Sequence, residues 1–187
     1  MNVLSDSGVF ITRVPDHTYH KTQILKSIQA MGVFGMTHHN SNVFNTDWHL
    51  PESWFSPREY WDICTPSVST HITALIEHMY PNFGAEWTIE KFWFQQYLPD
   101  IGTHEWHVHG GSMFSSVYYV ELPDSGAATS ILVGGREINI PVSEGDIVSF
   151  PSAYAHRSKK YRCPNGSKKT VVAFNTNIQI NELSDGS

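Results

Sequence analysis

The sequence of 187 residues is poor in several features that mark particular protein classes. It contains only two cysteines, Cys64 and Cys163, and no CxxC pair, which argues against a disulfide scaffold and against a cysteine-based zinc site. No apolar run approaches the roughly 20 residues that span a bilayer. The first residues lack the basic and apolar segments of a signal peptide, so we expect a cytoplasmic protein without a membrane partner.

Positive charge is also scarce. Lysine and arginine together number 12 against 18 aspartates and glutamates, and this balance argues against a nucleic-acid partner. Hydrophobic residues make up 40% of the chain and aromatic residues 13%, enough to bury a substantial core. At this length and composition we expect residues 1–187 to form a single domain.

The hydrophobic pattern changes along the chain. Apolar residues at helical spacing predict a helix over 17–31 and two short helices within 57–80, separated near Pro66. The polar stretch 37–51 between them predicts a long loop of the kind that covers an active site. From residue 86 onward, short alternating runs separated by turn signals predict a β-sandwich, jelly roll or small barrel. We therefore expect a helical layer and lid loop over 1–85 and a β core over 86–181, an α+β protein that is mainly β.

Histidine is abundant, with 11 residues, and its placement points to a metal site. On an extended chain, alternation puts Glu105, His107 and His109 on one face and His104 on the other. Two imidazoles spaced in this way can both reach one metal at about 2.1 Å. His156, which follows the strand-like run GDIVSF, is the next isolated candidate ligand.

A basic segment follows His156 and ends at Lys168 and Lys169, which begin the apolar strand TVVAFN. A lysine at the mouth of a β core, near a metal ligand, can pair with an anionic co-substrate. Alternation places Lys169 on the same face as Ala173 and Asn175, and Lys168 on the opposite face.

Three segments together carry a family resemblance: HVHGGSMFSSVYYV (107–120), GDIVSFPSAYAH (145–156) and KTVVAFN (169–175). They are similar to motifs of the Fe(II)- and 2-oxoglutarate-dependent oxygenases, specifically the short prolyl-4-hydroxylase-like branch. The resemblance implies a double-stranded β-helix core of the jelly-roll or cupin type. It also implies an enzyme that uses Fe(II), O2 and 2-oxoglutarate to hydroxylate a small-molecule or peptide substrate, such as an amino-acid side chain, with release of succinate and CO2.

The same resemblance assigns roles to individual residues. His107 and His156 are implied as iron ligands, and His109 stands at the third position, which a carboxylate usually occupies. Lys169, where arginine is usual, is implied to hold the distal carboxylate of 2-oxoglutarate. Tyr97 is implied to donate a hydrogen bond to that carboxylate. The resemblance also implies a cofactor-binding role for Asn175 near the metal end of the last strand.

Several alternatives stay open at this point. Three neutral imidazoles leave the charge of the metal unbalanced, so Glu105 is a second candidate for the third ligand, as Lys168 is for the co-substrate lysine. Residues 145–156 also nearly fit the second cupin motif, which would make the protein a three-histidine metal cupin, acting as a dioxygenase, isomerase or binding module. No glutamate follows the HxH at 112–115, which counts against this reading. A non-enzymatic jelly-roll structural protein is the third alternative, and neither substrate nor oligomeric state can be inferred.

Overall fold

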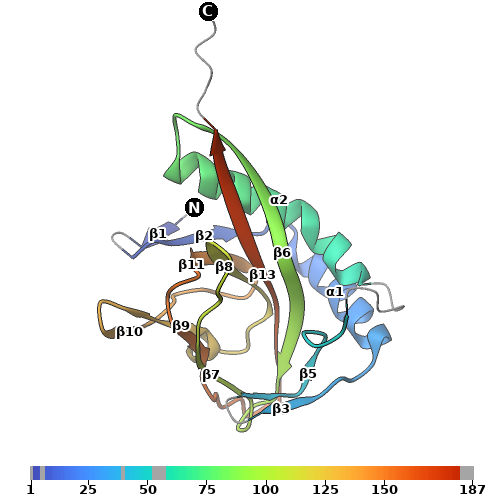
Figure 1. Ribbon diagram of the computed structural model, residues 1–187. Helices are drawn as coiled ribbons and strands as arrows, with labels where there is room; N and C mark the ends of the chain where they lie inside the picture. Colours follow the sequence, from blue (N-terminus) through green and yellow to red (C-terminus); the bar gives the residue numbers. More distant parts are fainter. Residues whose placement is uncertain (1, 5–6, 39–40, 52–57, 182–187) are drawn as a thin grey trace, which may run out of the picture.

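The computed structural model describes residues 2–4, 7–38, 41–51 and 58–181 (Figure 1). Two α-helices, α1 (His17–Met31) and α2 (Glu59–Met79), and one 3-10 turn, η1 (Ser125–Ala127), lie within these ranges. The strands are β1 (Asn2–Leu4), β2 (Val9–Arg13), β3 (Met36–His38), β4 (Ser41–Val43), β5 (Asn45–Thr46), β6 (Gly84–Tyr97), β7 (Thr103–His107), β8 (Phe114–Glu121), β9 (Thr129–Val133), β10 (Arg136–Asn139), β11 (Asp146–Pro151), β12 (His156–Ser158) and β13 (Lys169–Asn181).

The strands form two antiparallel sheets. The larger sheet has the order β1-β2-β11-β8-β13-β6-β5 and the smaller one has the order β10-β9-β12-β7-β4-β3. The longest strands, β6 and β13, pair along most of their length and extend past the rest of the β core (Figure 1). The predicted α+β class, with a mainly β core, is confirmed. Strands β1 to β5, which precede residue 86, also join the two sheets.

Alternation along β13 separates two cores on opposite faces of the larger sheet. Val172 and Phe174 face the helices, which cover one side of this sheet (Figure 1), and there they meet Ile28 of α1 and Ile72 of α2. Val171 faces the other way, into a second core between the two sheets. Because successive strand residues point to opposite faces, one strand supplies both cores.

Segment 57–80 does not form the two short helices that we predicted. Glu59–Met79 is one helix that includes Pro66. Proline removes a backbone hydrogen bond and costs about 3 kcal/mol inside a helix. The buried residues Cys64, Val68 and Ile72 lie on both sides of Pro66 along the chain, so burial of one continuous apolar stripe outweighs the cost.

Segment 37–51 is not the continuous loop that we predicted. Its described part contributes β4 and β5, which pair with β7 and β6. Asp47, fully buried, anchors it: the carboxylate accepts hydrogen bonds from the Tyr60 hydroxyl (2.6 Å) and the Phe94 amide (2.9 Å), and it pairs with Arg58 (3.2 Å). Burial raises the pKa of Asp47. The segment is thus fixed to the sheet by its polar side chains, which local sequence patterns do not reveal.

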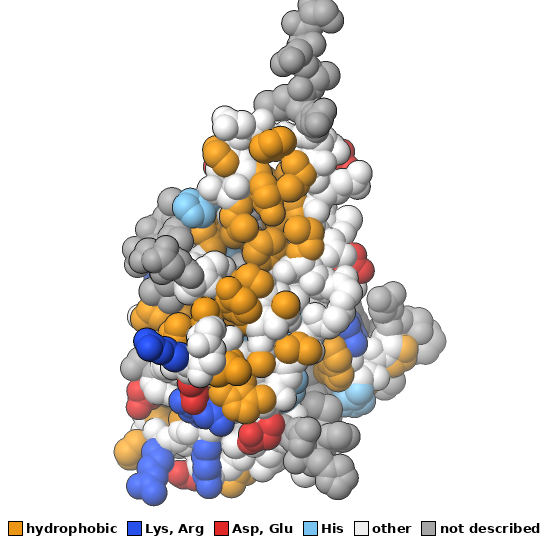
Figure 2. Space-filling model, turned by 60° about the vertical axis from the view of Figure 1, so that its left-hand side comes forward, with side chains coloured by type: hydrophobic (Ala, Val, Ile, Leu, Met, Phe, Trp, Pro, Cys, Tyr) orange, Lys and Arg blue, Asp and Glu red, His pale blue; other side chains and the backbone are white. Residues whose placement is uncertain are grey.

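The molecular surface is uneven in character. Figure 2 shows hydrophobic side chains gathered over the upper part of one face and charged side chains gathered at its lower end. The basic segment after His156 is held in part by ion pairs, since Glu137 contacts Arg157 (2.8 Å) and Lys159 (2.6 Å). Within the part of the chain that the structure describes, neither helix combines the length and apolarity needed to cross a membrane.

Candidate metal centre

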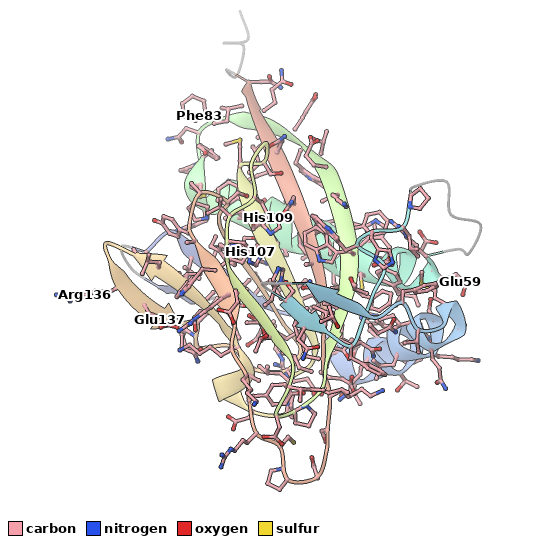
Figure 3. All side chains as sticks on the ribbon, turned by 60° about the horizontal axis from the view of Figure 1, so that its bottom comes forward. Glu59, Phe83, His107, His109, Arg136 and Glu137 are labelled. Atoms are coloured by element: carbon pink, nitrogen blue, oxygen red, sulfur yellow. The ribbon has the colours of Figure 1, made fainter. Side chains whose placement is uncertain are left out.

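Three histidines converge inside the β core. His107 ends β7, His109 follows two residues later, and His156 begins β12, where it pairs directly with His107. One ligand nitrogen from each imidazole lies within 4.8 Å of the others, and the ring centroids of His107 and His156 are 4.2 Å apart. Figure 3 shows His107 and His109 next to each other in the middle of the β core. The structure therefore brings together the three residues predicted as metal ligands.

In His107 and His156, a hydrogen bond to the backbone determines which ring nitrogen is free to bind a metal. His107 Nδ1 lies 2.7 Å from the Glu105 carbonyl oxygen, and His156 Nδ1 lies 3.0 Å from that of Tyr154. Because a carbonyl oxygen only accepts hydrogen bonds, each Nδ1 carries the proton and each Nε2 keeps its lone pair. This is the tautomer that metal-bound histidines usually adopt when Nε2 is the ligand.

The charge of the cluster follows from its burial. Desolvation lowers the pKa of His107, lowers that of His109 to about 4 and lowers that of His156 to about 3. All three imidazoles are thus neutral at neutral pH, the form that binds metals. Glu105 is exposed and is not one of the residues that line the pocket, so the structure places His109, and not Glu105, beside the other two histidines.

A fourth histidine, His104, lines the same pocket, although strict alternation predicts it on the opposite face. Its ring stacks on His107 at a centroid distance of 3.8 Å and an angle of 16°. The pairing of β12 with β7 explains this, because His156 lies opposite His107 whereas Ser158 lies opposite His104. One extra residue in β7 forms a bulge, and a bulge shifts the alternation of side chains by one position.

Lys169 lies at one end of the pocket and is almost fully buried, at 1% exposure. Its ammonium donates a hydrogen bond to Ser158 Oγ (2.8 Å) and lies 5.0 Å from the ring centroid of Tyr97, its cross-strand partner. Burial lowers the pKa of Lys169 to about 7 and raises that of Tyr97. None of the described residues that line the pocket is an aspartate or glutamate. Lys168 is exposed, so Lys169 is the lysine inside the pocket.

The other end of the pocket is lined by Asn175 and Trp93, both buried. The Trp93 ring centroid lies 5.5 Å from that of His109, and Trp48 lies 6.1 Å from the same histidine. The sequence places Asn175 on the correct face of its strand. It gives no reason to separate Trp93 from the other aromatic residues of the core, and only the surroundings of this side chain distinguish it.

Comparisons of whole structures place this architecture among known proteins. A viral collagen prolyl hydroxylase from Paramecium bursaria Chlorella virus-1, in complex with 2-oxoglutarate, is 10% identical, with a TM-score of 0.61 over 94% of this chain and 98% of that chain. A 2OG-Fe(II) oxygenase family oxidoreductase from Burkholderia pseudomallei is 14% identical, with a TM-score of 0.63 over 91% and 85%. A prolyl hydroxylase from Trichoplax adhaerens, in complex with a hypoxia inducible factor peptide fragment, is 14% identical, with a TM-score of 0.67 over 93% and 85%.

This chain has the fold of the 2-oxoglutarate- and iron(II)-dependent oxygenases. The predicted double-stranded β-helix core is thereby confirmed, as is the resemblance to prolyl-4-hydroxylase-like proteins at the level of the fold. No family model matches the sequence, and no curated protein matches it either. Because one fold can carry many activities, the function has to be argued from the residues of the pocket.

Proposed function

We propose that this protein is an iron(II)- and 2-oxoglutarate-dependent oxygenase that hydroxylates a small-molecule or peptide substrate and releases succinate and CO2. One observation carries the proposal. A cluster of three metal-competent histidines shares a buried pocket with a lysine whose ammonium donates a hydrogen bond to a serine hydroxyl and has no acidic residue beside it among the described lining residues. A pocket with this content suits a ligand that bridges a metal ion and a fixed cation.

His107, His109 and His156 would hold the iron. Imidazole is a common ligand of iron(II), and the Nδ1 hydrogen bonds of His107 and His156 direct Nε2 away from the backbone carbonyls. When bound, iron with 2-oxoglutarate and O2 supplies the oxidising power for C–H hydroxylation. The surrounding chain contributes orientation and a site from which bulk water is largely excluded.

Lys169 would hold the distal carboxylate of 2-oxoglutarate, and Tyr97 would donate to the same group after its hydroxyl turns from Gln95 Oε1, to which it donates at 2.9 Å in this structure. A divalent metal and a lysine ammonium in a pocket without acidic side chains leave an excess of positive charge, which a dianionic co-substrate offsets. Ser158 orients the ammonium through its hydrogen bond. Asn175 lies six residues further along β13, about 20 Å from Lys169 at roughly 3.3 Å per residue, and so cannot bind the same carboxylate.

A three-histidine metal cupin is the second candidate function. The observation that favours it is the presence of His109 where the usual iron site of these oxygenases has a carboxylate. This alternative requires the metal but requires neither 2-oxoglutarate nor Lys169, so the two functions make different predictions.

The test is an anaerobic titration of the metal-free protein with Fe(II) and then with 2-oxoglutarate, monitored by visible charge-transfer absorption. We expect a band that disappears in His107→Ala and weakens in Lys169→Met. The exposed residues His49 and Lys168 provide matched controls, and His49→Ala and Lys168→Met should retain the band. Fe(II) binding without a charge-transfer band would favour the cupin. If the folded wild-type protein neither binds Fe(II) nor shows the band, the proposed metal site is refuted.

A further inference from the structure

Two buried polar atoms in the pocket have no hydrogen-bond partner among the described residues. They are Nε1 of Trp93 and Oδ1 of Asn175, whose side chains are only 4% and 6% exposed. Buried donors and acceptors are nearly always paired, because an unpaired one loses its hydration without compensation. Since both residues line the pocket that holds the histidines, a bound molecule is the natural source of their missing partners.

The two atoms belong to the end of the pocket that is remote from Lys169. A series of side-chain contacts runs along the pocket from the buried lysine to this tryptophan, each residue contacting the next. Its members are Lys169, Tyr97, Gln95, His104, His107, His109 and Trp93. Two of the three candidate metal ligands, His107 and His109, thus lie between the buried lysine and Trp93 in this series of contacts. A five-carbon dicarboxylate held by Lys169 and the metal would not extend past His109 to Trp93. The hydrogen-bond partners of these two atoms must therefore come from a molecule other than 2-oxoglutarate.

The local geometry fixes both groups in place. Trp93 lies directly opposite Ala173 in the β6–β13 ladder, so Trp93 and Asn175 are diagonal neighbours on the same face of the sheet. Trp48 packs edge-on against the Trp93 ring at 4.4 Å, and the Lys91 ammonium lies 3.6 Å from the Trp48 ring centroid. These contacts hold the Trp93 indole in place beside the pocket, with its N–H buried.

The required partner chemistry follows from the two atoms. The indole N–H of Trp93 needs an acceptor, whereas Oδ1 of Asn175 needs a donor. A carboxylate offers only acceptors, an ammonium offers only donors, and a hydrocarbon offers neither. A hydroxyl offers both through a single oxygen, whereas an amide carries its donor and its acceptor on two separate atoms and is flat enough to lie against indole rings.

We propose that Trp93 and Asn175 form a binding site for an uncharged amide group of the substrate, on the side of the metal centre opposite the co-substrate. The assignment of this ligand as the substrate rests on the proposed function. The binding site itself can be tested without iron, 2-oxoglutarate or turnover.

The experiment follows the indole N–H resonance of Trp93 by 15N–1H NMR in the metal-free wild-type protein, with the resonance assigned by Trp93→Phe. Propionamide, propionate and propylammonium serve as probes of nearly equal size and different charge. We expect propionamide to shift this resonance saturably, with both ions leaving it in place. The indole resonances of Trp87 and Trp106, which do not line the pocket, provide internal controls.

Asn175→Leu should weaken propionamide binding about threefold to tenfold, the range for loss of one neutral hydrogen bond. Asn139→Leu, outside the pocket, should leave it unchanged. Equal shifts with the ions, no shift with propionamide, or unchanged affinity in Asn175→Leu would overturn the assignment. The charge-transfer titration is independent: a band without a propionamide shift rejects only the amide site, whereas a shift without a band rejects only the proposed oxygenase.

Discussion

Replacing Lys169 with methionine should stabilise the protein while weakening its affinity for 2-oxoglutarate. Burial lowers the pKa of Lys169 from its ordinary value of 10.5 to about 7, which corresponds to a free-energy cost of about 5 kcal/mol for the charged form in the folded state. Methionine has a similar length and no charge. At pH 7 about half of the folded-state lysine is already neutral, which reduces this cost to about 4 kcal/mol. Loss of the hydrogen bond to Ser158 offsets about 1 kcal/mol of the gain, so we expect a net stabilisation of about 3 kcal/mol at pH 7.

The pH dependence supplies a sharper signature than stability at one pH. Because the pKa of Lys169 is lower in the folded state, the unfolded chain binds more protons between about pH 7 and pH 10.5. The destabilisation caused by burying Lys169 is therefore absent above the unfolded pKa of 10.5, grows as the pH falls and is complete below the folded pKa of about 7. Relative to Lys169→Met, the wild-type unfolding free energy should rise by up to about 1.4 kcal/mol per pH unit within this window.

Urea denaturation across this pH range, with Lys168→Met as the matched exposed control, measures both effects. Thermal unfolding at pH 7 should show an increase in Tm of about 6–12 °C for Lys169→Met, at 2–4 °C per kcal/mol for a chain of this size. A variant that is less stable than wild type, or whose stability runs parallel to wild type from pH 7 to pH 10, would refute the reasoning that Lys169 is a buried, poorly compensated cation.

Three other predictions concern the metal, the co-substrate and the fold. His109→Asp should tighten Fe(II) binding about tenfold in a competitive chelator titration, because a carboxylate offsets metal charge that imidazole leaves unbalanced; unchanged affinity would argue against His109 as a ligand. The Kd for 2-oxoglutarate should rise as the pH increases above about 7, because Lys169 loses its proton, and Lys169→Arg should show a flat profile over the same range. Asp47→Ala should lower the urea-derived unfolding free energy by about 3–5 kcal/mol, because it leaves Arg58 and a backbone amide without their buried partner; the exposed control Asp62→Ala should stay near wild type, and a similarly small loss at Asp47 would contradict the anchoring role.

The sequence by itself was enough to predict the fold class and six of the residues that line the pocket: Tyr97, His107, His109, His156, Lys169 and Asn175. Strand alternation is a local property of the backbone, so it correctly placed Lys169, Ala173 and Asn175 on one face and Lys168 on the other. The HxH spacing at His107 and the isolated His156 likewise needed only short motifs.

Features that depend on strand pairing could not be read in this way. His104 enters the pocket because of a bulge in β7, and a bulge is defined only against the partner strand β12. Residues 41–46 become strands because β7 and β6 offer free edges there, and α2 continues through Pro66 because its buried stripe packs on the sheet. In each case the deciding interaction joins residues far apart in the chain.

The chemistry of the pocket likewise depends in part on local sequence and in part on tertiary structure. The sequence determined which side chains are available, three imidazoles and a lysine on the right faces of their strands. The tertiary structure alone decided how they are surrounded: it buries Lys169 without an acidic neighbour in the pocket and leaves the polar atoms of Trp93 and Asn175 unpaired. Burial and hydrogen-bond satisfaction are properties of an environment assembled from many strands, and no single segment of sequence contains them.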